Sequence, residues 1–364
     1  MRKPWFFLLV GVVAITLSGQ SAFARQQEQA PDPIFPVQTV VEDKNSETVY
    51  PSVAGNFVVF SQRVNNEFSV VRTSSENISA DGKLIGAAQP NEAIRYGVAI
   101  KDGSIGYISN RMGPIGAWMR QGQGDGHIAI GNISTFSGAL MPANLKASAD
   151  GQVWTFDSSL EKTRRARVLS DFNDGFKQGE LIGQTWRMYH SDAWRFKQSY
   201  HPTQPGTVNK FQAPSLFLFD RNSSQLTMIP NAFNGAISPD GKRVAFVREL
   251  GGNYDLWIQN VDGSGLMQLT TNSFGDFEPA FSPDGNQIAF VSNRDSQGEV
   301  LETSIYVISL KSGKIKRITN ALRATDGGPA WKDNQTLLFH SNRNSSRPQD
   351  RAGSKWNIWK VEFK

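Results

Sequence analysis

Short runs of alternating apolar and polar residues, separated by tight turns, recur along most of this chain and predict a protein built from β-strands. The pattern is clearest in two copies of one phrase, Gly235–Val247 and Pro279–Val291, each containing Ser-Pro-Asp-Gly followed by an apolar strand. In this turn Pro presets φ, Asp bonds to its own backbone and Gly takes a positive φ. Self-similarity at this spacing indicates a repeat architecture, because each unit buries its apolar face only against its neighbours.

One repeat unit predicts four strands. In the stronger copy these are Pro279–Phe281, Gln287–Val291, Ser304–Leu310 and Lys314–Thr319, each rich in residues that favour strands. Four antiparallel strands in about 45 residues form one blade of a β-propeller.

Weaker copies of the turn extend the repeat in both directions along the chain. Each is followed by an apolar strand, and together with the two strong copies they number six. The spacing is about 45 residues except for one interval of about twice that length, between the third and fourth turns. We therefore expect an all-β fold, a six-bladed propeller, with turns at Ala54-Gly55-Asn56, Lys101-Asp102-Gly103, Ala149-Asp150-Gly151, Pro239-Asp240-Gly241, Pro283-Asp284-Gly285 and Lys332-Asp333-Asn334.

The double interval either hides a seventh blade or carries a long insertion, and we favour the insertion, at about residues 160–213. No second Asp-Gly turn with an alternating apolar strand lies between Leu160 and Ala213. Ser215–Phe219 and Gln225–Ile229 instead supply the third and fourth strands that the blade beginning at Asn144 still lacks.

The two ends of the propeller, which we place at residues 36–364, are expected to pair. The last blade has only three strands of its own, Gly328–Trp331, Gln335–His340 and Trp356–Phe363. An unpaired edge invites aggregation, so a closed ring needs a fourth strand. Pro36–Val41 alternates in the right way, and we predict that it pairs with Trp356–Val361 and seals the last blade.

The N-terminus has the layout of a secretory signal. Arg2 and Lys3 precede an apolar run from Trp5 to Leu17 and a small-residue stretch that ends at Ala24. This predicts cleavage near Ala24, a linker at residues 25–35 and a periplasmic mature chain with no transmembrane segment. The alternative is an uncleaved N-terminal anchor. The chain has no cysteine, so its core must stabilise it without disulfides.

Charge and composition exclude several classes of partner. The formal net charge is +5, but the charges are dispersed, and two of them belong to the predicted signal. Export and the lack of a basic stripe argue against nucleic acid. Four scattered histidines make a histidine-rich metal centre unfavourable, and we expect neither a metal nor a cofactor.

The repeat resembles a known family. Ser-Pro-Asp-Gly followed by Ile-Ala-Phe-Val-Ser-Asn-Arg and then Ile-Tyr-Val-Ile looks like the repeat of TolB-type six-bladed propellers, strongly from Ala232 onward and weakly before it. The stretch Ser215–Asp220 leading into Ser238 is also similar to the propeller of prolyl oligopeptidase relatives. The Gly-x-Ser-x-Gly elbow of their hydrolase domain is absent from the sequence. The resemblance thus implies a propeller without its usual companion domain.

A tripeptide with a terminal arginine follows the second strand of most blades. Since strand two returns to the side from which strand one starts, these tripeptides should share the face of the interblade loops. We interpret the arginines mainly as partners of acids in those loops, such as Asp276, Glu278 or Asp326. The alternative is a rim that binds carboxylate or peptide ligands. The candidates are Arg63, Asn110, Arg111, Asn293, Arg294, Asn342 and Arg343, with Arg248 at a related point.

The insertion is the second candidate surface. Residues 171–204 are rich in polar and aromatic residues without a strand period, which favours contact with a partner or ligand, and Trp186, Tyr189 and Trp194 are its candidate residues. Alternatively the insertion folds back as a lid over the channel mouth. His190 and His201 lie within it, but no positioned nucleophile accompanies them.

These patterns favour an exported, monomeric, non-catalytic scaffold that binds a protein or peptide in the periplasm. The alternative is a propeller enzyme or carbohydrate-binding protein that uses the central channel and residues 171–204. Fold does not decide between them.

Overall fold

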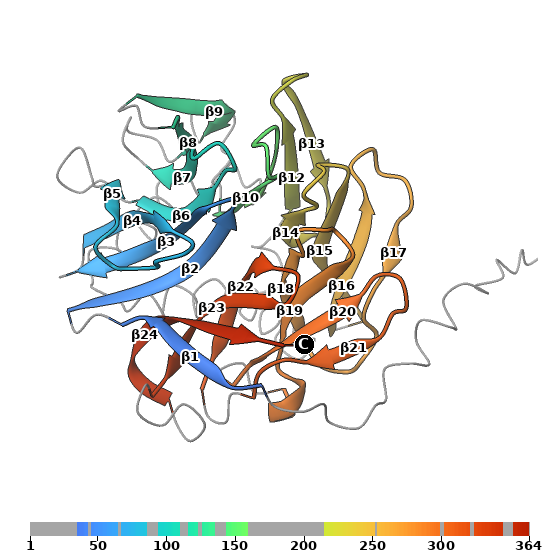
Figure 1. Cartoon of the computed structure of the whole chain (residues 1–364). Coiled ribbons are helices and arrows are strands. Elements are labelled where there is room, and N and C mark those ends of the chain that lie inside the picture. Colours follow the sequence, from blue (N-terminus) through green and yellow to red (C-terminus); the bar gives the residue numbers. More distant parts are fainter. Residues whose placement is uncertain are drawn as a thin grey trace, which may run out of the picture.

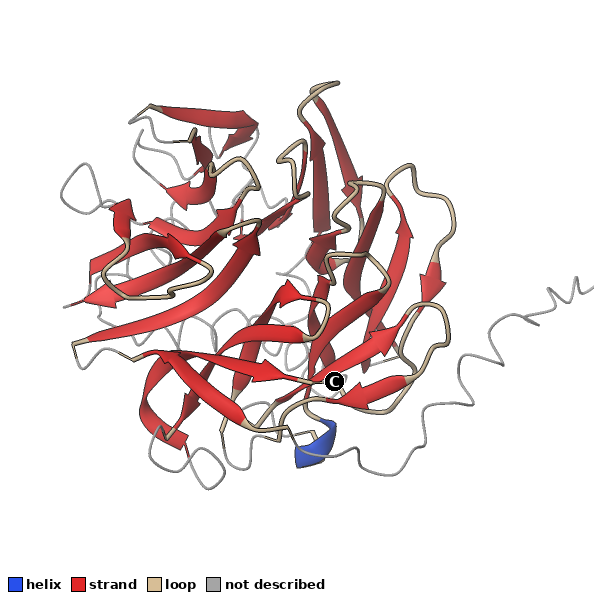
Figure 2. Cartoon of the chain, viewed as in Figure 1, coloured by secondary structure: helices blue, strands red, loops and turns tan. Residues whose placement is uncertain are grey.

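The computed structural model describes residues 35–42, 45–64, 67–85, 94–109, 116–122, 126–134, 143–158, 215–251, 253–298, 302–320, 324–344 and 352–363. These residues form six four-stranded antiparallel sheets arranged as the blades of a propeller (Figure 1). The predicted all-β fold with six blades is confirmed. Within the described residues the one helical element is the short 3-10 turn η1 (Arg294–Ser296), drawn in blue in Figure 2. None of these residues forms a helix long and apolar enough to cross a membrane.

In blades one to five the four strands follow the chain from the inside of the ring to the outside, and in blade six the N-terminal strand β1 takes the outer position. Blades one to three contain β2 (Ser46–Ala54), β3 (Phe57–Val64), β4 (Glu67–Ser74) and β5 (Lys83–Ile85); β6 (Ile94–Ala99), β7 (Ile105–Ser109), β8 (Gly116–Arg120) and β9 (His127–Ser134); β10 (Ala143–Ala147), β11 (Val153–Ser158), β12 (Ser215–Asp220) and β13 (Gln225–Ile229). Blades four to six contain β14 (Phe233–Ile237), β15 (Arg243–Leu250), β16 (Asn253–Asn260) and β17 (Met267–Gln268); β18 (Asp276–Phe281), β19 (Gln287–Ser292), β20 (Ser304–Ser309) and β21 (Ile315–Arg317); β22 (Asp326–Asp333), β23 (Thr336–Arg343), β24 (Ala352–Glu362) and β1 (Val37–Val41).

The first strands of the six blades form a closed inner ring. Each of β2, β6, β10, β14, β18 and β22 lies next to the first strand of the following blade, and β22 returns to β2. The apolar core lies between blades: Phe290 and Tyr306 of blade five, for example, share a cluster with Val247 and Leu256 of blade four. Each sheet therefore buries its faces against its two neighbours, as the repeat predicts.

The N-terminal strand seals the last blade. β1 pairs antiparallel with β24, with Val37 opposite Val361 and Val41 opposite Ile358. Its register shifts once, between Thr39 and Val41. The predicted pairing of residues 36–41 with Trp356–Val361 is confirmed.

Blade three is assembled from two distant parts of the sequence. β11 pairs with β12 from Val153 opposite Asp220 to Ser158 opposite Ser215, and β10 and β13 complete the sheet. The predicted third and fourth strands of this blade are confirmed. Residues 159–214, and with them the boundaries of the insertion, lie outside the described residues, as does the predicted signal.

The Ser-Pro-Asp-Gly turn is held by its own side chains. Asp284 Oδ1 accepts hydrogen bonds from Ser282 Oγ at 2.6 Å and from the backbone N–H of Asn286 at 3.0 Å. Gly285 adopts a φ of +70°, a conformation that favours glycine. The acid of this turn is thus structural, as the sequence indicates.

A β-bulge interrupts the first strand of every blade. One residue in each bulge is left-handed, with φ between 48° and 55°, and the register of strands one and two shifts at that point. A bulge takes its residues out of the regular ladder and re-aims them. The six equivalent residues are Tyr50, Tyr96, Asn144, Asn234, Glu278 and Gly328.

Candidate functional site

Polar side chains near the inner ring join one blade to the next through the bulges. The backbone N–H of Tyr50 in blade one donates to His340 Nδ1 of blade six at 3.3 Å. The N–H of Asn234 in blade four donates to Asp157 Oδ2 of blade three at 3.0 Å, and that of Gly328 in blade six donates to Glu278 Oε2 of blade five at 2.7 Å. We call these three contacts the bulge latches. They satisfy N–H groups that the bulge would otherwise leave without a ladder partner.

Asp157 gives the latch between blades three and four an unusual electrostatic character. The residue is 4% exposed. Burial raises its pKa to about 8, although hydrogen bonds from the backbone of Asn234 and Gly235 and the nearby charge of Lys146 oppose this shift. Burial also lowers the pKa of Lys146, against the attraction of Glu278 and Asp157. An acid and a base with shifted pKa values therefore lie close to the inner ring.

The same seam contains buried polar atoms without a hydrogen-bond partner. Both side-chain polar atoms of Asn234 and the Oγ1 of Thr155 are in this state. The seam is tight, since a Cβ added to Gly235 would lie 2.6 Å from Thr155 Oγ1 and 2.4 Å from a methyl group of Leu216. Glycine at this position lets β14 approach β11. Buried polar atoms are usually hydrogen-bonded, so the unpaired atoms of this seam are exceptions.

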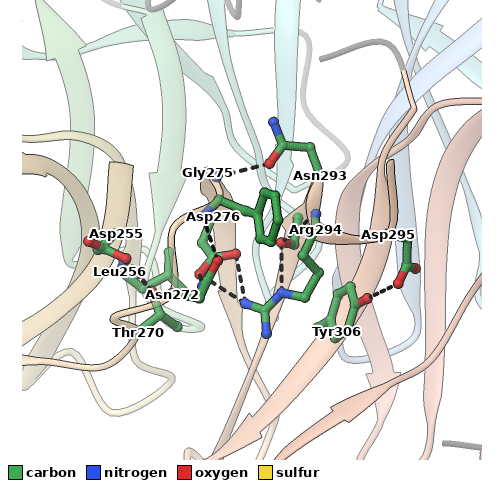
Figure 3. A network of polar contacts seen from close by, with 12 residues as sticks. Asp255, Leu256, Thr270, Asn272, Gly275, Asp276, Asn293, Arg294, Asp295 and Tyr306 are labelled. Carbon is green, nitrogen blue, oxygen red and sulfur yellow. Dashed lines mark hydrogen bonds and ion pairs between the residues drawn. The ribbon is translucent and has the colours of Figure 1, made fainter. Parts of the chain in front are cut away.

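The face on which strand two ends and the next blade begins carries the predicted arginines. We call this face the connection rim. Arg294 Nη2 donates to both carboxylate oxygens of Asp276, at 2.9 and 3.0 Å, and Arg294 Nε donates to Ser292 Oγ at 2.9 Å (Figure 3). Asn272 Nδ2 donates to the same carboxylate at 2.7 Å. Burial works to lower the pKa of Arg294, but the charge and hydrogen bonds of Asp276, with Tyr306 and Asp295, raise it overall.

Two other described arginines of the pattern, Arg343 and Arg63, also have acid partners in the first strand of their own blade. Arg343 and Asp326 form a buried ion pair, with Arg343 Nε donating to Asp326 Oδ1 at 2.8 Å. Arg63 Nη1 lies 3.4 Å from Glu47 Oε2. These geometries agree with the interpretation that the arginines are structural. Of the three acids named from the sequence, Asp276 and Asp326 pair with these arginines.

The amides of the pattern hold the loops between blades. Asn293 Oδ1 accepts from the N–H of Gly275 at 2.9 Å, and its Nδ2 donates to the carbonyl of Gly298 at 3.0 Å. Asn342 Oδ1 accepts from the N–H of Thr325 at 2.8 Å. Each side chain therefore ties the end of strand two to the start of the same blade.

The structure shows that the tripeptides are not all in register. Val291, which lies opposite Phe277 just before the bulge, corresponds to Ser61 in blade one and Val247 in blade four, because these lie opposite Val49 and Phe233. Arg63 is thus one position earlier in its blade than Arg294, and Arg248 is two positions earlier. A sequence comparison without the bulge positions does not reveal this offset.

Several predicted site residues lie outside the described part of the chain. These are Asn110 and Arg111 of blade two, and Trp186, Tyr189, His190, Trp194 and His201 of the insertion. Among the residues that the structure does describe, no group of three or more histidine, aspartate or glutamate side chains is placed to hold a metal ion.

Sequence reasoning missed the residues at the inner ring. Asp157 and Lys146 lie on ordinary strands, and nothing in their neighbours marks them as charged groups that become buried. The available signal was the position of Asp157 at the end of a strand where the other blades carry Val247, Val291 or His340. A carboxylate among mostly apolar counterparts is informative once the register is known.

Comparisons with known proteins agree with this architecture. Residues 210–304 match the family PD40, the TolB beta propeller domain. The Tol-Pal system protein TolB of Anaeromyxobacter dehalogenans (strain 2CP-C) is 32% identical over 134 residues, which are 34% of this chain and 29% of that relative. The matched region therefore spans less than a third of the curated relative.

Solved structures resemble the chain over most of its length. A putative TolB from Agrobacterium tumefaciens aligns with a TM-score of 0.52 and 13% identity over 90% of this chain and 97% of that one. An oligogalacturonate lyase in complex with manganese aligns with a TM-score of 0.51 and 10% identity over 92% and 99%. At such low identity these likenesses establish the fold alone, that of a six-bladed β-propeller. The match to the TolB beta propeller domain lies within blades three to five of this fold.

Proposed function

We propose that this chain is an exported, non-catalytic propeller of the periplasm that binds a protein or peptide partner. Two features support this proposal: the predicted secretory signal and the TolB-type repeat. A closed propeller suits the task because its rigid sheets hold surface groups at a fixed geometry.

The observation that carries the proposal is the set of charged and amide side chains at the inner ring. Lys146, Glu278 and Asn144 come from first strands of blades three and five and keep some accessible surface. Their rigid support comes from the bulges and the bulge latches. Charged donors, carboxylate acceptors and amides in one place match the backbone and side chains of a peptide.

Candidate contacts on the connection rim extend this surface. Arg63, Arg294, Arg343, Asn293 and Asn342 already have partners within their own blades, so a ligand there competes with these contacts. Asn110, Arg111, Trp186, Tyr189 and Trp194 are proposed as contacts from the sequence pattern.

Affinity capture from periplasmic extract tests the proposal. The bait is the full mature chain, compared with a variant lacking residues 171–204 and with the double variant Lys146→Met, Glu278→Gln. The matched control is Lys242→Met. Lys242 is exposed and lies in the turn between β14 and β15, at the end of blade four opposite the connection rim. We expect one captured partner to be retained by the control and lost from at least one of the other variants. Equal capture by all four proteins contradicts the proposal.

Export has a separate test. N-terminal sequencing of the protein from the periplasmic fraction should give a chain that starts near Arg25. Recovery of the full-length chain in the membrane fraction would instead support the uncleaved anchor.

A second function is favoured by one observation. Asp157, with its pKa raised to about 8 by burial, lies near Lys146, whose pKa burial lowers, and shifted pairs of this kind occur at catalytic sites. A propeller enzyme or carbohydrate-binding protein would use this pair together with residues 171–204. Incubation with polysaccharide and peptide mixtures should then yield products that disappear with Asp157→Asn. No product from the wild-type chain rules against catalysis on those substrates.

A further inference from the structure

Blades four and five each place a guanidinium group over a pair of aromatic rings, and the two pairs occupy equivalent positions. In blade five, Arg294 lies over Phe290 and Tyr306, with 5.5 and 4.6 Å between its Cζ and the ring centroids. In blade four, Arg248 lies over Phe246 and Trp257 at 5.1 and 5.4 Å. The two platforms correspond, because Phe246 pairs with Trp257 across β15 and β16 as Phe290 pairs with Tyr306 across β19 and β20.

The surroundings of the two guanidinium groups differ in the residue that lies two positions before the left-handed bulge residue. In blade five this residue is Asp276, the carboxylate that receives two hydrogen bonds from Arg294 (Figure 3). In blade four the residue just before Phe233, at the position of Asp276 before Phe277, is Ala232. Blade four thus keeps the cation and its platform but has a methyl group in place of the acid.

No described residue replaces the missing acid. Arg248 forms no ion pair with any residue that the structure describes, its Nε has no hydrogen-bond partner, and burial lowers its pKa. The acid directly opposite in the sheet is Asp255, but Thr270 Oγ1 and Gln268 Nε2 donate to its carboxylate at 3.3 and 3.2 Å. Arg248 is nevertheless only partly buried.

We propose that Arg248 is a carboxylate-binding site on the connection rim and takes an acidic side chain or a C-terminal carboxylate of a peptide partner. A guanidinium binds a carboxylate through two parallel charge-assisted hydrogen bonds, as Arg343 and Asp326 demonstrate within this chain. Stacking on Phe246 and Trp257 restricts the plane of the guanidinium, so less conformational entropy is lost on binding. This inference rests on the proposed function, since it names the chemistry of the partner.

Nuclear magnetic resonance of the arginine side chains tests the site directly. The protein, labelled with ¹⁵N at arginine Nε, is titrated with an amidated tetraglutamate peptide, with an acetylated tetraalanine peptide that has a free C-terminus, and with the amidated form of the latter. The Arg248 signal is assigned by its loss in Arg248→Gln. We expect it to shift and saturate with at least one of the first two probes, while the Arg294 signal stays in place.

Two variants separate the site from general charge attraction. Ala232→Asp supplies the acid that blade five has, so it should weaken the probe's affinity by at least about tenfold, the effect of losing one charged hydrogen bond. Asp255→Asn should leave binding intact. Thermal unfolding of each variant confirms that it is folded. If Ala232→Asp does not fold, the comparison between the wild-type chain and Arg248→Gln decides the outcome.

The outcomes of this titration are distinct from those of the capture experiment. No shift of the Arg248 signal with either carboxylate probe overturns the inference, and so does an equal shift of all arginine signals. If a partner is nevertheless captured and lost from the variants described above, the proposed function stands and only the chemistry assigned to Arg248 fails. Saturable binding at Arg248 without a captured partner leaves the carboxylate site and removes the support for a peptide-binding scaffold.

Discussion

Blades four and five have almost the same repeat phrase, the same turn and the same stacked pair of rings, yet they treat a buried cation differently. In blade five the guanidinium group of Arg294 donates hydrogen bonds to Asp276 and Ser292. Asn272 donates another to the carboxylate of Asp276. In blade four Ala232 leaves the equivalent guanidinium without a partner among the described residues. The comparison teaches that the backbone of a repeat is set by its turn and apolar positions, whereas one residue at the start of strand one decides whether a charge is neutralised within the blade.

The energetic consequence differs between the two blades. A buried ion pair contributes little net stability when both members are present, but removing one member leaves a charge in a low-dielectric surrounding. An arginine that still reaches water keeps part of its hydration and does not depend on a partner in the same way. Blade five should therefore be sensitive to substitution at this position, and blade four should not.

Asp276→Ala breaks the comparison most severely. It gives blade five the residue of blade four and strands the guanidinium of Arg294, so we expect the free energy of unfolding to fall by about 3 to 5 kcal/mol. Chemical denaturation followed by circular dichroism measures the change. The control is Asp262→Ala, which removes an exposed acid from blade four. A similar small loss in both variants would show that the pair is not needed for stability.

Asp157→Asn tests a second buried charge, at the seam between blades three and four. Because the pKa of Asp157 in the folded chain is about 8, above its ordinary value of 3.8, the protonated form favours folding. Stability of the wild-type chain should fall as the pH rises from about 4 to about 8, by about 2 to 4 kcal/mol between pH 5 and pH 8. The variant should lack this part of the dependence.

Unfolding titrations at three pH values measure this difference, with Asp150→Asn as a control in the exposed turn of blade three. If the wild-type chain and Asp157→Asn follow parallel curves, the acid is ionised at neutral pH and its burial does not dominate.

Arg248→Gln should have the smallest effect on stability. No ion pair with a described residue is lost, although the contacts with Phe246 and Trp257 are, so the free energy of unfolding should fall by no more than about 1 kcal/mol. Arg294→Gln, measured in parallel, should cost several times more because it leaves the carboxylate of Asp276 buried and alone. Equal losses for the two substitutions would mean that Arg248 has a structural partner of its own.

Most of the fold follows from local patterns in the sequence. The six predicted turns and the apolar strands after them locate the second strand of each blade, and the three-stranded last blade predicts the pairing of residues 36–41. Turn chemistry and strand periodicity act over a few residues, and the requirement to pair every edge supplies the long-range contact.

The candidate site followed from the sequence only in part. The acid partners of the rim arginines were anticipated at Asp276 and Asp326, because a repeated charge normally serves the repeat. The offset of Arg63 and Arg248 was missed, since it depends on the bulges, which carry no common residue type: Tyr50, Glu278 and Gly328 occupy equivalent positions. Asp157 was missed because burial of a charge depends on how two blades meet.

The pairing of β1 with β24 also determines when the ring of blades can close. β1 precedes all the other described strands and β24 follows them, so the blade that they share remains open until the rest of the propeller has been synthesised. Pairings between such distant segments form slowly, because loop-closure entropy must be overcome before the contact contributes. In the proposed export, a chain whose ring closes last can stay unfolded while it passes through a narrow translocation pore.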